Sequence, residues 1–199
     1  MVTGDISREQ RLRLRDGTEV MVRPIAPGDK AKLVEGLHQL SPASSYRRFM
    51  RPVTSLSARE LSYLTEVDYT DHFAWVALAD ESDSRGLGVA RYVRDPKDPE
   101  VAEAAVAVID DFHNRGLGTV LIALLVESAL GNGIRVFRGW VLGDNVEVLR
   151  PLERIGARRT PEGGVLRVEV DLSDVFEGST IQEALRAVAA GEFEPQPRS

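Results

Sequence analysis

The stretch His113–Leu130, HNRGLGTVLIALLVESAL, decides the fold because two glycines lead directly into a pattern of helical period. Spacings of three and four predict one buried helix face, ending near Gly131 and Gly133 and formed by Leu117, Val120, Leu121, Leu124, Leu125 and Ser128. The first N–H groups of such a helix lack internal partners, and glycines at 116 and 118 let a ligand approach them. The stretch therefore predicts an anion site at a helix N-terminus.

The tetrapeptide RGLG occurs twice, at 85–88 and at 115–118, so its surroundings have to separate the two copies. After the first copy, an alternating segment runs to Pro96 and Pro99, which predicts a hairpin turn and a strand. Only the second copy precedes a helix. A GxG sequence before a core helix also fits an ordinary loop, so the order of the neighbouring elements has to decide.

The composition limits the chain to one hydrophobic core. With 199 residues, 43% of them hydrophobic, the chain can bury one full core but hardly two. We expect an N-terminal arm and first hairpin strand in residues 1–16 and one domain over 17–172. A C-terminal helix and flexible tail are expected in 173–199.

Charge and residue content exclude several classes of function. A net charge of −6 disfavours a nucleic-acid or anionic-membrane surface. The lack of cysteine excludes disulfides and thiol nucleophiles, and His38, His72 and His113 are isolated from one another, so we expect no metal site. We find no apolar run of membrane-spanning length and no secretory signal, which favours a cytoplasmic protein without membrane attachment.

The predicted elements follow a mixed α/β order. Asp16-Gly17 predicts a hairpin turn, Ser41-Pro42 a helix cap, and Ser57 with Glu60 a capping box. Helices are expected over 28–40, 43–50, from 57 to before 71, over 117–131 and 146–155, and from Thr180 onward, where a second capping box begins. Strands are expected over 72–80, 87–95, 100–110 and 134–142, with a final strand pair within 156–172.

Other phosphate-binding and hydrolytic motifs are absent. Leu121 stands where a dinucleotide fingerprint needs a third glycine, and no Gly-Lys-Ser/Thr follows the turn. The sequence also lacks a GxSxG nucleophile motif.

The order of strands, a (Gln/Arg)-x-x-Gly-x-(Gly/Ala) turn, helix, strand, Asn-started helix and strand pair resembles the GNAT superfamily of acetyl-CoA-dependent N-acetyltransferases over residues 17–172. The most specific parts are VAVIDDFHNRGLGTVLI and LGDNVEVLRPLERIGA. RDGTEVMVRPIAPGDKAKLVEGLHQLSPASSYRRF and VAEAAVAVIDD further resemble bacterial Pat-type protein lysine acetyltransferases. The resemblance implies a twisted, mostly antiparallel sheet of about seven strands flanked by helices. It also implies acetyl-CoA as co-substrate, no metal, and a protein acceptor such as an acyl-CoA synthetase.

The same resemblance implies the residues that hold the coenzyme. The diphosphate would lie on the turn formed by His113, Asn114, Arg115, Gly116, Leu117, Gly118 and Thr119. The pantetheine arm would pair with Val106, Ala107 and Val108, and Asn145 would be a further coenzyme contact. Two positions depart from the family: His113 replaces Gln or Arg, and Leu152 replaces a tyrosine that protonates the departing thiolate.

Acyl transfer to a lysine needs a base, because its ammonium group has a pKa of about 10.4 and no free electron pair. Glu103 is the candidate: it is the only charge in the apolar run VAEAAVAVI, and we expect burial to raise its pKa. A solvated carboxylate at the strand's start, like Glu100, is the alternative. Asp110 and Asp111 would repel a diphosphate, so we interpret them as solvated or as partners of the helix dipole.

Three arginines have several possible roles, and two tryptophans are expected to have a structural one. Arg47, Arg48 and Arg51 rim the acceptor site, hold an acidic partner surface, or form a solvated helix face that buries Tyr46 and Phe49. Trp75 and Trp140 are expected in the core.

Protein lysine acetylation by direct attack of the amine on the thioester is the favoured function. The alternatives are acetylation of a small amine and a non-catalytic acyl-CoA sensor. The acyl group, the natural acceptor, the general acid and the oligomeric state stay open at this point.

Overall fold

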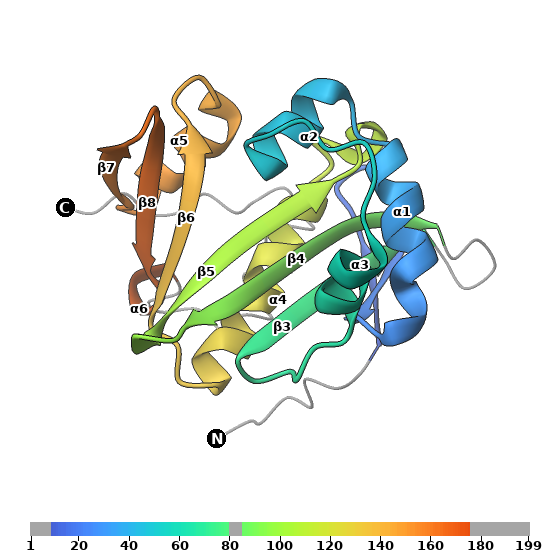
Figure 1. Cartoon of the computed structure of the whole chain (residues 1–199), viewed down its shortest axis with the longest axis horizontal. Coiled ribbons are helices and arrows are strands. Elements are labelled where there is room, and N and C mark those ends of the chain that lie inside the picture. Colours follow the sequence, from blue (N-terminus) through green and yellow to red (C-terminus); the bar gives the residue numbers. More distant parts are fainter. Residues whose placement is uncertain (1–8, 80–84, 176–199) are drawn as a thin grey trace.

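One mixed sheet of eight strands organises the chain in this computed structural model, which describes residues 9–79 and 85–175 (Figure 1). The strands lie in the order β1-β2-β3-β4-β5-β6-β8-β7. Their bounds are β1 Gln10–Arg13, β2 Glu19–Pro24, β3 His72–Leu78, β4 Gly86–Asp95, β5 Asp98–Val108, β6 Val136–Leu142, β7 Arg158–Glu162 and β8 Val165–Asp171. The helices are α1 Lys30–His38, α2 Pro42–Phe49, α3 Ala58–Thr65, α4 Leu117–Gly131, α5 Val146–Arg154 and α6 Leu172–Val175.

The sheet is mixed but mostly antiparallel, as expected. Among the strand pairs that the structure describes, only β5 and β6 run parallel. The resemblance implies about seven strands; the structure has eight, because Gln10–Arg13 forms a regular edge strand against β2. The helix expected from Thr180 lies outside the described residues, which end with the short helix α6.

Local sequence signals place the helix starts correctly. The Ser41 side chain accepts a hydrogen bond from Ser44 N at 3.1 Å and caps α2. At α3, Ser57 Oγ accepts from Glu60 N and Glu60 accepts from Ser57 N, so the predicted capping box is confirmed. The Asp16-Gly17 turn is also confirmed, with Gly17 at a φ of 85° between β1 and β2.

Helix α4 forms the centre of the larger core. It packs against β3, β4 and β5, and every member of its predicted buried face is buried in the structure. Trp75 from β3 is 1% exposed, and its indole N–H donates to Ser128 Oγ of α4 at 3.0 Å. A second apolar cluster fills the other sheet face beneath α1, and a third joins α5 to β6 and β8. No helix of the described ranges is long and apolar enough to cross a membrane.

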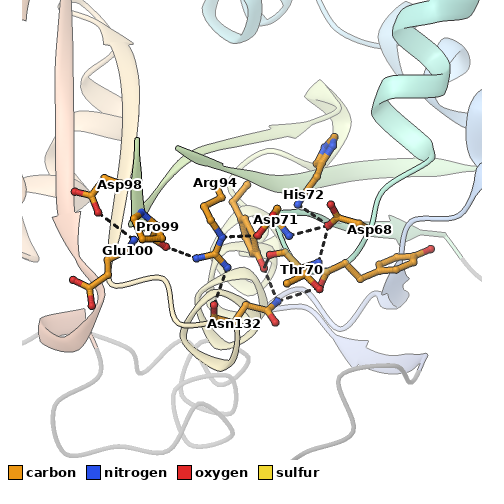
Figure 2. Close-up of polar contacts among 11 residues, drawn as sticks. Asp68, Thr70, Asp71, His72, Arg94, Asp98, Pro99, Glu100 and Asn132 are labelled. Atoms are coloured by element: carbon orange, nitrogen blue, oxygen red, sulfur yellow. Dashed lines mark hydrogen bonds and ion pairs between the residues drawn. The ribbon is translucent and has the colours of Figure 1, made fainter. Parts of the chain in front are cut away.

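A polar network ties the C-terminal end of α4 to the sheet (Figure 2). Arg94 of β4 donates to Asp71 at 2.6 Å, to the Asn132 carbonyl at 2.8 Å and to the Pro99 carbonyl. One Asp68 carboxylate oxygen accepts three successive backbone N–H groups in the segment before β3. Because a cation at a helix C-terminus interacts favourably with the last carbonyls, Arg94 holds three segments and this helix end together.

His72 and Arg91 form a buried polar pair on the sheet face that α1 and α3 cover. Arg91 is 5% exposed and its guanidinium lies 3.1 Å from His72 Nε2. Burial, reinforced by the positive charge of Arg91, lowers the pKa of His72 from 6.5 to about 4. His72 is therefore neutral at physiological pH and accepts the hydrogen bond from the arginine.

This pKa shift predicts an acid-sensitive contribution to stability. Above pH 6.5 the imidazole is neutral in both states, whereas between pH 6.5 and about 4 only the unfolded chain takes up the proton. Relative to His72→Gln, which keeps an acceptor for Arg91, the wild type should lose on the order of 3 kcal/mol of unfolding free energy across this interval. Urea unfolding of both proteins at a series of pH values measures the difference. Parallel pH profiles would contradict the assignment.

Candidate active site

Strands β5 and β6 form a fork whose open side exposes backbone groups. They pair at three positions only, the last being Glu103 with Arg138, and then separate as β5 continues along β4 and β6 along β8. Figure 1 shows the two strands diverging toward α2 and α5. Gly139 follows directly, and a side chain there would come within 3.2 Å of the Ala104 carbonyl oxygen. The β5 segment 104–108 thus presents an open strand edge to the gap. An extended ligand can pair with such an edge like an added strand.

The predicted coenzyme contacts Val106, Ala107 and Val108 lie on this open segment, all half-buried. His113 reaches back to it, with Nε2 at 2.9 Å from the Val108 carbonyl oxygen. Since a carbonyl only accepts, this ring nitrogen carries the proton. His113 therefore connects the glycine turn to the strand edge through its side chain. The sequence did not predict this contact.

The glycine turn leaves the start of α4 without partners. Asn114 and Gly116 adopt positive φ angles of 59° and 89°, and α4 begins at Leu117 without a side-chain cap. The first hydrogen bond of the helix runs from Val120 N to Gly116 O at 3.1 Å. Within the described residues, the N–H groups of Leu117, Gly118 and Thr119 have no acceptor. A site for an anion at this position is consistent with the helix dipole and the free donors.

The β1–β2 turn adds charge beside the glycine turn. Arg15 N donates to the Arg115 carbonyl at 3.4 Å, and the Arg15 side chain lies 3.5 Å from where a Cβ on Gly116 would be. Arg115 itself pairs with Asp16 at 3.1 Å and stacks over Phe112. The role of Arg15 could not be found from the sequence, because nothing local indicates that a turn at residue 16 contacts residue 115.

Asp110 has a structural role that the sequence did not indicate. Its Oδ1 accepts a hydrogen bond from Ser41 N at 3.2 Å and so anchors the start of α2. Although burial opposes ionisation, the hydrogen bonds from Ser41 and Ser44 lower the pKa of Asp110. Asp110 is partly exposed and lies at the start of α2 rather than that of α4, whereas Asp111 is exposed as expected.

Asn145 lies at the start of α5. The residue is 9% exposed, and its carbonyl accepts from Leu149 N at 3.0 Å. Its side chain does not cap α5. An amide at this position can donate to and accept from a ligand in the gap.

Glu103 stands at the last rung of the fork, but the expectation that it is buried is wrong. The residue is exposed, because the apolar run around it alternates between the α4 face and the opposite face of the sheet. Its register partner Arg138 is bound to Glu169 at 3.0 Å and to Asp95 at 2.8 Å. In the described part of the chain Glu103 forms no ion pair. It interacts electrostatically with Arg48 of α2 at longer range. The position of Glu103 at the fork, and not its burial, therefore makes it a candidate base.

A groove of about 500 Å³ lies across the fork between α2 and the β6–α5 loop. Tyr46 and Arg47 line one side, and Leu142 and Asp144 line the other. Tyr46 is 45% exposed, so the alternative in which α2 buries it is wrong. The three arginines diverge: Arg47 lines the groove, Arg48 is half-buried on the inner side, and Arg51 pairs with Glu60 at 3.3 Å.

Two further residues bear on acid chemistry and on the core. Leu152 packs in the apolar cluster of α5, β6 and β8 and offers no proton. Trp75 is in the core as predicted, whereas Trp140 is half-buried and belongs to none of the three apolar clusters of the described chain. Residues 9–79 and 85–175 hold no group of three or more His, Cys, Asp or Glu side chains placed to bind a metal.

Comparison with known proteins gives a family match and a curated relative. The model of the acetyltransferase (GNAT) family matches residues 42–157. Acetyltransferase Pat of Mycolicibacterium smegmatis is 36% identical over 168 residues, which are 82% of this chain and 49% of that protein. The chain therefore spans about half the length of this relative.

Solved structures share the fold. The GNAT domain of S. lividans PAT superimposes with a TM-score of 0.75 at 30% identity, covering 82% of this chain and 96% of that domain. The structure of yncA from Salmonella typhimurium with its cofactor acetyl-CoA has a TM-score of 0.63 at 17% identity, covering 77% of this chain and 94% of that one. At that identity the second likeness concerns the fold alone.

Two glycine substitutions separate backbone strain from ligand exclusion. Gly116→Ala places a side chain at a φ of 89° and should cost about 1–2 kcal/mol of unfolding free energy. Gly118→Ala meets only a Val108 methyl at 3.8 Å, so the protein should stay as stable as the wild type or gain slightly. Its methyl group nevertheless stands at the helix start, and calorimetry should show coenzyme A binding weakened at least about tenfold.

Gly28→Ala serves as the control, because a Cβ there meets nothing within 4 Å and the residue lies before α1. Wild-type affinity of Gly118→Ala for coenzyme A would contradict a diphosphate at this helix start.

Proposed function

This chain belongs to the acetyltransferase (GNAT) family, and from that premise we propose that it transfers an acetyl group from acetyl-CoA to a lysine side chain of a protein. An acyl-CoA synthetase is the proposed acceptor and the cytoplasm the proposed location. The observation that carries the proposal is the fork itself: the unpaired start of α4 and the open edge of β5 lie on one path that ends at Glu103. The 36% identity to acetyltransferase Pat supports acetyl transfer as the reaction, whereas the choice of a protein acceptor rests on the sequence resemblance to Pat-type enzymes.

The residues along this path are suited to a long, extended coenzyme. The N–H groups of residues 117–119 would bind the diphosphate, with Arg15 adding positive charge nearby. The edge of β5 would pair with the amide groups of pantetheine, and the Asn145 amide at the start of α5 would donate or accept from the other side of the gap. When bound, acetyl-CoA supplies a thioester as the acyl donor.

Glu103 would act on the incoming amine. Its exposed carboxylate at the fork accepts the ammonium proton, directly or through one water, and leaves a free electron pair on nitrogen. That pair attacks the thioester carbonyl carbon, the C–N bond forms, and the C–S bond breaks with its electrons on sulfur. The nitrogen then loses its second proton, and since Leu152 has no proton to give, water relays that proton to the departing thiolate. No cysteine exists to carry the acyl group, which suits direct transfer.

The groove between α2 and the β6–α5 loop is the proposed approach for the acceptor. It is open, and it carries Arg47 on one wall and Asp144 on the other, so a peptide segment of mixed charge suits it. Acetylation of a small amine is the nearest rival. A non-catalytic acyl-CoA sensor is the alternative of another class, because Leu152 stands where the family has a tyrosine that acts as the general acid.

Glu103→Gln should lower kcat about 100-fold or more while coenzyme A affinity changes little, because the amide keeps the shape and loses the base. Glu100→Gln is the matched control: the residue is exposed in the same strand, three positions before Glu103, and should keep wild-type turnover. Steady-state rates and calorimetry report the two quantities. Equal turnover of Glu103→Gln and wild type would remove Glu103 from the mechanism.

Intact-mass measurement across an acceptor panel tests the substrate class. With acetyl-CoA supplied, we expect a single acetyl addition on lysines of an acyl-CoA synthetase and none on free polyamines or aminoglycosides. Turnover of small amines alone would replace the proposed acceptor. Binding of coenzyme A without turnover of any acceptor would favour the sensor.

A further inference from the structure

A second cavity, of about 80 Å³, lies between the sheet and the helices α1, α2 and α3. Its walls are apolar side chains such as Leu37, Phe49, Leu64 and Val89. This volume exceeds the roughly 10–15 Å³ that a single water occupies, and it suits a molecule of a few carbon atoms. The cavity is separate from the groove between α2 and the β6–α5 loop, with which it shares no lining residue.

Two guanidinium groups, those of Arg91 and Arg48, line this otherwise apolar space. Arg91 donates to His72 Nε2 and to the Leu64 carbonyl, both at 3.1 Å, and neither acceptor carries a negative charge. In the ranges that the structure describes, no carboxylate lies within ion-pair distance of either arginine. A third cation at the wall, Lys32, differs because it pairs with Asp29 at 3.1 Å.

Arg48 lacks hydrogen bonds to the described residues and stacks over Phe49, with its guanidinium carbon 5.0 Å from the ring centroid. Burial lowers the pKa of Arg48, although the field of Glu103 acts in the opposite direction. Burial, followed by the charge of Arg48, also lowers the pKa of Arg91, to about 10. Both side chains stay protonated at neutral pH, so the cavity holds two cations that repel each other in a poorly hydrated place.

An anion between the two guanidinium groups would relieve this repulsion and supply charge-assisted hydrogen bonds. The leucines, Phe49 and Val89 favour an apolar body behind that anion, and the volume limits its length. We propose that this cavity binds a small carboxylate with a short apolar chain, its carboxylate between Arg48 and Arg91.

Such a carboxylate has two sources, a free acid or the distal end of a dicarboxylic acyl thioester. Arg91 lies opposite Ala105 in the β4–β5 register, and Glu103 is two residues earlier on the same face. Ala107 and Val108 of β5 line the cavity, so the cavity borders the open edge of the fork. The thioester source rests on the proposed function, whereas binding of a free acid does not.

Calorimetry of the wild-type chain with butyrate and succinate, and with butanol as the uncharged control, tests the site directly. We expect saturable binding of the acids at millimolar concentration, with one site per chain, and none of butanol. Arg91→Met should weaken acid binding at least about tenfold, because it removes a charge-assisted hydrogen bond. Arg59→Met, an exposed arginine of α3, should bind like the wild type.

Arg48→Met provides a second variant, since Arg48 makes no hydrogen bond that folding needs, and should also bind at least about tenfold more weakly. Absence of acid binding by the wild type, or equal binding by Arg48→Met and the wild type, would overturn the proposal.

Acyl-transfer rates with succinyl-CoA and butyryl-CoA distinguish the two sources. A kcat/KM at least about tenfold higher for succinyl-CoA, lost in Arg91→Met, identifies the acyl donor as the source. Equal rates together with binding of free succinate identify the free acid. If the wild type transfers no acyl group but still binds the free acids, the proposed function is refuted and the proposed carboxylate site remains supported.

Discussion

The burial of α4 against β3, β4 and β5 determines where the functional groups of this protein lie. The helix is apolar over most of its surface and cannot move without exposing the core that it forms with Trp75 and its neighbours. Arg94 holds its far end through the Asn132 carbonyl, and the turn after β5 limits its near end. The unpaired N–H groups at residues 117–119 therefore stand at a fixed distance from the open edge of β5.

The second constraint is the early separation of β5 and β6. After three paired positions each strand follows a different neighbour, and Arg138 with Glu169 and Asp95 stabilises the point of separation. Gly139 permits the close approach to Ala104 that this point requires. The result is a gap with the open edge of β5 on one side, Asn145 near the other, and Glu103 at its apex. The groups proposed to bind the diphosphate and pantetheine are therefore backbone groups that secondary structure leaves without partners.

The distribution of arginines follows from the same arrangement. Arg15 lies beside the start of α4, Arg47 lines the groove between α2 and the β6–α5 loop, and Arg48 and Arg91 line the inner cavity. A chain with a net charge of −6 thereby places cations at three places where an anion or an acidic partner can meet them. Overall charge excluded a broad basic surface, but it said nothing about these local groups.

Local chemistry in the sequence determined the elements and their order. The capping residues Ser41, Ser57 and Glu60, the Asp16-Gly17 turn and the periodicity after Gly118 predict elements that the structure contains, because each signal acts within one turn of backbone. The family resemblance added candidate coenzyme contacts, of which residues 106–108 lie on the open edge of β5 and residues 117–119 at the start of α4.

Only the tertiary structure decided which face a residue takes and which distant segments meet. Glu103 is exposed and Tyr46 is not buried, because strand register and the position of α2 depend on contacts across the whole sheet. The contact of Arg15 with the turn at Gly116 and the meeting of Arg48 with Arg91 join residues that are distant in sequence. Composition and periodicity specify how strongly a segment prefers burial, but the partner that covers it is chosen by the packing of the folded chain.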